Sequence, residues 1–232
     1  MLFLDFHGPC LGRIDNTASN LDKEHRLWYF REDLGVNLHH WHWNLVYPVQ
    51  ASDRSIVDKD RRGELFYYMH EQIIARYNSE RFSNNLHRVM RLNNLRAPIA
   101  EGYFPKLYSS NASRAWAARA AGATLKDINR SMENFHVDLS ELERWIERVH
   151  DAINQKFVIN ADGQRIELTA SNGIDILGNI VEASMLSPNR EFHGNLHNFD
   201  HVFISYSHDP DGRHLEDMAV MGTTVRKKHF PY

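Results

Sequence analysis

Apolar residues recur about every 3.6 positions in several stretches of the chain, and turn-forming residues separate these stretches. The first stretch predicts a helix over residues 20–35, with inward positions at Leu27, Phe30 and Leu34. A second helix is predicted from about Asn37 to the Tyr47-Pro48 break, because proline disfavours helical backbone in the residue before it. The first quarter of the chain is therefore expected to be helical.

The same period returns in four later segments. It predicts helices over residues 58–78, 139–155, 173–186 and 189–209, the last of them largely apolar on one side. These segments contain no internal repeat and no low-complexity tract, and no linker divides them. We therefore expect one mainly α domain.

Two segments depart from the helical pattern. Residues 91–134 mix turn formers with short periodic pieces, which predicts a long irregular segment with one short helix near 113–120. Residues 157–168 read "FVINADGQRIEL", in which Asp-Gly between two short apolar runs is typical of a tight β-hairpin. The predicted fold is mainly α with long irregular loops and a small β-hairpin.

Composition narrows the chemistry. The chain has 232 residues, 42% of them hydrophobic, and a net charge of −3, so no global attraction to nucleic acid or acidic membranes is expected. Its single cysteine, Cys10, excludes an internal disulfide and a cysteine-rich zinc module. The N-terminus lacks the pattern of a signal peptide, and no apolar run is long enough to span a bilayer. With 15 histidines, nitrogen is the candidate metal donor.

The stretch "LHHWHW" holds the first of two histidine clusters. Two ligands on one helix must be three or four residues apart, because only such side chains share a face. His39 and His42 are the only histidine pair at that spacing in this cluster. Spacing alone therefore selects this pair and passes over His40.

The second cluster is "HGNLHNFDH", in which His193, His197 and His201 are four residues apart. Three such side chains on one helix would span roughly 12 Å at 1.5 Å per residue, too far for all to reach one ion. We therefore expect one adjacent pair to bind. The pattern also allows histidines that are merely hydrogen-bonded in the core, and spacing leaves both interpretations open.

Longer motifs point to a known family. The chain resembles the copper-bearing central domain of arthropod prophenoloxidases and hemocyanins from about residue 20 to residue 222. The motifs that carry the resemblance are "EHRLWYFREDLGVNLHHWHWNLVYP", "DKDRRGELFYYMHEQIIARYNSERFSNNL", "GIDILGNIVEASMLSPNREFHGNLHNFDHVFISYSHDPDGRHLE" and "VMG". The segments "LHHWHWNLVYPVQAS" and "RAWAARAAGATLKD" are more similar to prophenoloxidase than to the oxygen carrier.

The resemblance implies a four-helix bundle that holds two copper ions, each bound by three histidines, with dioxygen between them. Imidazole suits copper in both oxidation states. The implied ligands are His40 and His70 for the first copper and His197 and His201 for the second. The resemblance therefore overrules His39 with His42, and it also leaves out His193.

Two departures from the family pattern weaken the implied sites. Asn44 stands where the family motif "HHWHWHLVYP" has a histidine ligand, and an amide oxygen is a weak donor to Cu(I). After Gly222 the chain reads "TTVRKKHFPY", whereas the family continues to an "FYRWH"-like segment with the third ligand of the second copper. His229 is too early to take that place. Two histidines per copper are therefore expected.

The implied function is that of a copper-containing phenoloxidase, a tyrosinase-type monooxygenase. Such an enzyme hydroxylates monophenols and oxidises o-diphenols to quinones for melanin formation, with dioxygen and phenolic compounds as substrates. No catalytic side chain is predicted apart from the ligands, and the departures predict impaired activity. The alternative is a non-catalytic storage or regulatory protein related to hemocyanin.

The resemblance also divides the chain into three segments. Residues 1–19 are predicted to be a divergent N-terminal segment, residues 20–222 the copper-bearing domain and residues 223–232 a divergent tail. We expect a cytoplasmic protein or one released into the hemolymph, with no nucleic-acid or membrane partner. An oligomer is left open.

Overall fold

The computed structural model describes residues 23–208 except 107, 110–113, 116–117 and 131–134. The helices in this part are the 3-10 helix η1 (Lys23–Leu27), α1 (Trp28–Arg31), α2 (Leu34–Val46), α3 (Arg54–Val57), α4 (Arg62–Ser83), α5 (Leu139–Gln155), α6 (Gly173–Val181), α7 (Arg190–His193) and α8 (Leu196–His208). The strands pair antiparallel as β1 (Tyr108–Ser109) with β2 (Arg114–Ala115), β3 (Ile128–Arg130) with β4 (Phe135–Val137), and β5 (Phe157–Ile159) with β6 (Arg165–Glu167). The predicted mainly α fold is confirmed.

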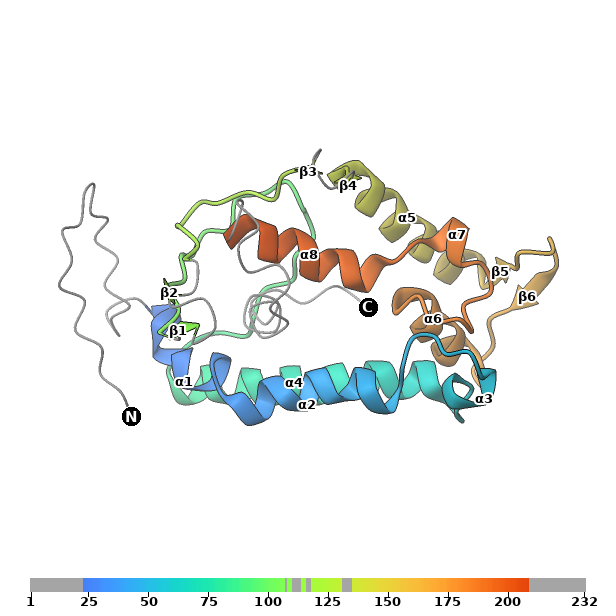
Figure 1. Cartoon of the computed structure of the whole chain (residues 1–232), viewed down its shortest axis with the longest axis horizontal. Coiled ribbons are helices and arrows are strands. Elements are labelled where there is room, and N and C mark those ends of the chain that lie inside the picture. Colours follow the sequence, from blue (N-terminus) through green and yellow to red (C-terminus); the bar gives the residue numbers. More distant parts are fainter. Residues whose placement is uncertain (1–22, 107, 110–113, 116–117, 131–134, 209–232) are drawn as a thin grey trace.

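The long helices enclose the main hydrophobic core. In Figure 1, α2 and α4 run along one side of the molecule, and α8 and α5 run along the other. The buried residues between them include Phe66 of α4, Leu142 and Val149 of α5, Ile180 of α6 and Phe203 of α8. Trp43 of α2 packs against this core from outside. Burial of these apolar side chains is what holds the helices together.

The best predicted elements are α5 and the hairpin after it. Helix α5 covers the predicted residues, and its apolar period buries one face, including Leu142 and Trp145. It ends at Lys156, whose backbone is left-handed, and β5 follows at once. The Asp-Gly turn then returns the chain to β6, with Gly163 at a φ of +79°.

The N-terminal helices begin and end differently from the prediction. Asp33 caps α2 by accepting a hydrogen bond from the Val36 amide at 2.7 Å, so the helix starts at Leu34 rather than near Asn37. Of the three residues predicted to point inward, Leu27 and Phe30 are buried, but Leu34 at the start of α2 is exposed, so that part of the prediction is wrong. The side chain of Asp33 and not Gly35 determines where the two helices separate.

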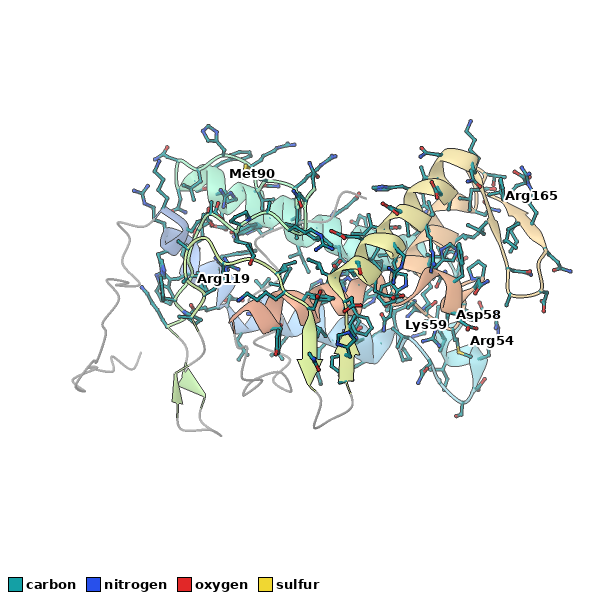
Figure 2. All side chains as sticks on the ribbon, turned by 90° about the horizontal axis from the view of Figure 1, so that it is seen from above. Arg54, Asp58, Lys59, Met90, Arg119 and Arg165 are labelled. Atoms are coloured by element: carbon teal, nitrogen blue, oxygen red, sulfur yellow. The ribbon has the colours of Figure 1, made fainter. Side chains whose placement is uncertain are left out.

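The predicted helix at 113–120 is wrong. Arg114 and Ala115 form strand β2, and Arg119 exchanges backbone hydrogen bonds with Tyr103 at 2.8 and 2.9 Å. These partners lie outside the predicted helix, in residues 103–109, and such pairing overrides the helix propensity of an alanine-rich stretch. Figure 2 places Arg119 near one end of the molecule and Arg165 of the hairpin near the other.

The predicted single helix over residues 189–209 is also wrong, because it is divided into α7 and α8 at Gly194. This glycine has a φ of +73°, a conformation that other residues rarely adopt. A Cβ atom at Gly194 would lie 2.0 Å from the ring of Trp145, so the close approach of α5 also requires glycine here. His193 is therefore on a different helix from His197 and His201.

Some predictions fall on residues that the structure does not describe. These are residue 229 and both predicted domain boundaries, after residue 19 and after residue 222. Within the described part, none of the helices combines the length and apolar content that crossing a membrane would require.

Candidate metal centre

Four histidines from three helices converge between α2, α4 and α8. The ring centroid of His40, on α2, lies 5.3 Å from that of His70 on α4 and also 5.3 Å from that of His201 on α8. The centroids of His70 and His197 are 4.8 Å apart. The structure thus brings together the four histidines that the family resemblance selected, from segments far apart in the sequence.

The closest pair is on α8. His197 and His201 are one helical turn apart, and their Nε2 atoms are separated by 3.0 Å. At this distance the two nitrogens share either a proton or a bound cation, because two facing lone pairs would repel. His40 completes a group in which one ring nitrogen from each of the three histidines lies within 4.8 Å of the others.

The ring of His70 is fixed by a hydrogen bond to the backbone of its own helix. Its Nδ1 lies 2.8 Å from the carbonyl oxygen of Phe66, and a carbonyl can only accept, so Nδ1 carries the proton. Burial lowers the pKa of His70 to about 4, which keeps the ring neutral. Its Nε2 is therefore a buried lone pair, and this atom has no hydrogen-bond partner. Such an atom is suited to bind a metal ion.

Phe66 also shapes the centre. Its ring centroid lies 4.4 Å from that of His70 and 5.0 Å from that of His197. The phenyl ring therefore packs against one histidine from each side of the centre. This packing restricts the rotation of both imidazoles, as the surroundings of a metal site commonly do.

The histidines that spacing alone selected lie elsewhere. His39 and His42 are on the exposed side of α2 and do not join the group. His193 is buried on α7, where neither ring nitrogen has a hydrogen-bond partner. Its pKa is lowered to about 4, first by burial and then by the nearby charge of Arg148. Spacing therefore selected a pair on α2, three residues apart, that does not join the group, whereas one adjacent pair of the second cluster, His197 with His201, does meet.

A pocket of about 630 Å³ opens beside the centre, with His40, His197 and His201 in its wall. Its other lining residues are Leu34, Asn37, Leu38, Trp41, Asn44, Pro48, Val49, Gln50, Glu182, Ala183, Arg190, Asn195 and Asn198. Asn44 is exposed to this pocket one turn after His40. The amide thus stands next to the histidine group, at the position where the resemblance expects an imidazole.

A buried ion pair positions the helices around the pocket, and sequence reasoning did not find it. Arg62 of α4 forms a salt bridge with Glu182, and both side chains are almost fully buried. The other carboxylate oxygen of Glu182 accepts a hydrogen bond from Trp43 Nε1 at 3.1 Å. Burial raises the pKa of Glu182, and Arg62 and Trp43 oppose that rise. No local pattern could have revealed these contacts, since Arg62 and Glu182 are 120 residues apart.

Arg62 also holds the C-terminal end of α2. Its Nη2 donates to the carbonyl oxygens of Tyr47 at 2.9 Å and Pro48 at 3.0 Å. One guanidinium therefore connects the end of α2 with Glu182, and α2 is the helix that carries His40. We call Arg62, Glu182 and Trp43 the polar anchor.

The donor set fits copper. Imidazole nitrogen is a good ligand for copper, and at least one of these nitrogens, Nε2 of His70, is buried without a partner. The contact between the Nε2 atoms of His197 and His201 shows that both point at one place. His40, His197 and His201 line the pocket, so an ion or a small molecule in the pocket can reach them.

Known proteins resemble the chain over most of its length. Residues 10–226 match the family described as "Hemocyanin, copper containing domain". Phenoloxidase 2 of Drosophila melanogaster is 64% identical over 208 residues, which are 90% of this chain and 30% of that protein. The crystal structure of a hemolymph-type prophenoloxidase from a crustacean has a TM-score of 0.78 and 36% identity, covering 91% of this chain and 33% of the other. A scorpion hemocyanin in its activated state has a TM-score of 0.77 and 42% identity, covering 92% and 34%. The chain thus spans about a third of the length of these relatives.

Proposed function

The chain belongs to the hemocyanin family of copper-containing domains, and on that basis we propose that it is the copper-bearing domain of a phenoloxidase-type protein. The activity proposed is hydroxylation of monophenols and oxidation of o-diphenols to quinones, the chemistry of melanin formation. The observation that carries the proposal is the convergence of His40, His70, His197 and His201 beside one pocket. The identity of 64% to a phenoloxidase supports this activity over oxygen transport.

In this proposal the four histidines hold copper, and copper when bound supplies the redox chemistry by which dioxygen oxidises phenols. The side chains of the protein do the rest. Phe66 and its carbonyl oxygen fix the ring of His70, so that Nε2 faces the centre. The polar anchor connects α2, the helix that carries His40, to α4 and to the end of α6.

The pocket supplies the substrate site. Its volume of about 630 Å³ accommodates a single phenolic ring with room for substituents. Leu38 and Trp41 provide apolar surface against which an aromatic ring can pack, and Asn44 and Asn198 provide amides that can hydrogen-bond a hydroxyl group. A small phenol or o-diphenol matches this combination of surfaces.

Asn44 makes us expect weak activity from this sequence. An amide oxygen contributes little to binding Cu(I), so copper near His40 and His70 should be held by fewer strong donors than the family pattern provides. The position of Asn44 on the pocket wall beside the histidine group favours a second candidate. In that candidate the chain is a non-catalytic storage or regulatory relative of hemocyanin.

Copper content and dopamine oxidation, measured on the same sample, test the two candidates. We predict that Asn44→His raises copper affinity at least about tenfold, roughly 1.4 kcal/mol, and increases the oxidation rate. His39→Asn is the matched control, because His39 is an exposed residue of the same helix outside the group. If Asn44→His leaves both copper affinity and oxidation unchanged, position 44 is not a ligand position and the proposed impairment is wrong.

The remaining features of the proposal follow the relatives. Dioxygen and phenolic compounds are the proposed small-molecule partners, and we propose an extracellular location in hemolymph, which the crustacean relative's description supports. Hemolymph fractions probed with an antibody against residues 139–155 would test the location. Absence from the cell-free fraction would contradict it.

A further inference from the structure

Three of the four histidines form a group that includes members of both implied copper sites. The family resemblance assigns His40 to one copper and His197 with His201 to the other. In the structure these three form one group, with one nitrogen from each within 4.8 Å of the others, whereas His70 does not complete it. The group therefore combines ligands from both implied sites.

We infer that the chain binds a single metal ion through His40, His197 and His201, with copper(II) preferred over zinc(II). The inference rests on the proposed copper function and specifies how many ions this sequence holds and by which residues. The preference follows from the general order of stability of imidazole complexes, in which copper(II) exceeds zinc(II). Three protein nitrogens with access from a pocket are also the usual donor set of a reactive rather than a structural metal site.

The α8 pair already has the separation that one ion needs. Two nitrogens that each lie about 2.0–2.1 Å from a common ion are separated by about 2.9–3.4 Å when the angle at the ion is about 90–110°. The Nε2 atoms of His197 and His201 are 3.0 Å apart. An ion can therefore replace the proton that these nitrogens share, without a change in the α8 backbone.

His40 needs only a small adjustment to join the pair. One ring nitrogen of His40 lies within 4.8 Å of a ring nitrogen of His197 and of a ring nitrogen of His201. Closing that separation to about 3.4 Å is a movement within the range of a rotation about the side-chain torsions. His40 is only partly buried beside the pocket, so its ring has room to turn.

Among residues 23–208, as far as the structure describes them, a second ion is left without enough donors. After the three-histidine group is used, the described residues near it offer Nε2 of His70 and the amide of Asn44. His70 gives one nitrogen only, because its Nδ1 is bound to the carbonyl oxygen of Phe66. One imidazole and one weak amide donor would not hold a copper ion against dialysis.

Copper stoichiometry and electron paramagnetic resonance (EPR) on the full chain test the inference. The protein is loaded with copper(II), dialysed, and analysed for metal content and for EPR signal intensity. An isolated copper(II) ion has one unpaired electron and gives a signal, whereas a strongly coupled copper(II) pair gives none. We expect about one ion and about one spin per chain. Two ions without a signal, or no bound ion, would overturn the inference.

Variants identify the ligands. His40→Ala and His201→Ala should each lose the ion, whereas His70→Gln should retain it with its EPR signal. His42→Ala is the matched control, an exposed histidine on the same helix as His40. Circular dichroism establishes that each variant is folded, and zinc(II) binding followed by native mass spectrometry repeats the count with an ion that has no redox chemistry. Loss of the ion in folded His70→Gln, or its retention in His201→Ala, would contradict the assignment.

The same samples separate this inference from the proposed function. Dopamine oxidation together with two ions per chain would support the phenoloxidase proposal and overturn the single-ion inference. One EPR-visible ion without oxidation above that of free copper would support the inference and contradict the catalytic proposal.

Discussion

The substitution Glu182→Gln tests whether the polar anchor holds the copper-bearing helix in place. The Glu182 side chain is 2% exposed and that of Arg62 is 0% exposed, so neither charge can be solvated if the other is removed. Glutamine keeps the volume of the side chain and an oxygen that can still accept from Trp43 at the observed 3.1 Å. The change therefore removes the charge while it leaves the packing and one hydrogen bond intact.

The magnitude follows from burial. Removing one partner of a buried ion pair typically costs about 3–5 kcal/mol, because the remaining charge is left in a medium that solvates it poorly. With the glutamine oxygen on Trp43, the amide nitrogen faces the guanidinium and cannot accept a hydrogen bond from it, so we expect a cost of at least about 3 kcal/mol. Folded proteins are stable by only about 5–15 kcal/mol, and the loss would therefore be a large part of the total.

Urea unfolding at pH 8 measures the effect. With a slope of about 1–3 kcal/mol per molar urea, the midpoint should fall by about 1 M or more. Glu64→Gln is the matched control, because Glu64 forms an exposed ion pair with Arg61 on the same helix as Arg62. Such surface pairs contribute about 0.2–1 kcal/mol. Equal midpoint shifts in the two variants would refute the role assigned to the anchor.

Two further predictions concern the segment between α5 and α8. Gly194→Ala should destabilise the protein by about 2–5 kcal/mol in urea unfolding, because a Cβ would overlap the Trp145 ring. Gly163→Ala is the control: Gly163 has a similar φ but no atom within 4 Å of an added Cβ, so the change should cost only about 1–2 kcal/mol. Equal costs in the two variants would contradict the clash with Trp145. His193 has a pKa lowered from 6.5 to about 4, so the unfolded chain binds a proton that the folded one does not. The free energy of unfolding should therefore fall by up to about 3 kcal/mol as the pH decreases from about 6.5 to about 4. Unfolding measured at several pH values should show a smaller pH dependence in His193→Leu, and the contribution of His70, whose pKa is also lowered, should remain.

The sequence predicted elements whose signals are local. Helix α5 has a regular apolar period and a clear end, and the hairpin after it has an Asp-Gly turn. In both cases the residues that determine the conformation lie within the element itself. A pattern of this kind can therefore be interpreted without knowledge of the rest of the chain.

The predictions failed where residues outside the predicted element determine its backbone conformation. Gly194 divides the predicted C-terminal helix because Trp145, 49 positions earlier in the printed sequence, occupies the space that any side chain would need. Partners nearer in the sequence, but outside the predicted helix, replace the helix that alanine content favours at 113–120. Strand β2 pairs with β1, and Arg119 pairs with Tyr103. Propensity is a weak determinant when such tertiary contacts compete with it.

Spacing identified histidines that can lie on one face of a helix, but it could not indicate which face of the helix is directed toward the other helices. His39 and His42 satisfy the rule and are exposed, whereas His40 violates it within its own cluster and meets His201 across the gap between two helices. The partners of His40 come from α4 and α8, so no periodicity within α2 could have selected it. The family resemblance selected it because long motifs carry information about contacts between helices.

The polar anchor and the metal centre depend on each other through α2. Trp43 follows His40 by three residues, so the two side chains leave the helix on the same side. If Glu182→Gln allows α2 to shift, the ring of His40 moves relative to His201, and copper affinity should fall together with stability. Glu64→Gln should change neither. A Glu182→Gln variant that loses stability but keeps its copper affinity would show that the anchor stabilises the fold without positioning His40, which would contradict the proposed coupling through α2.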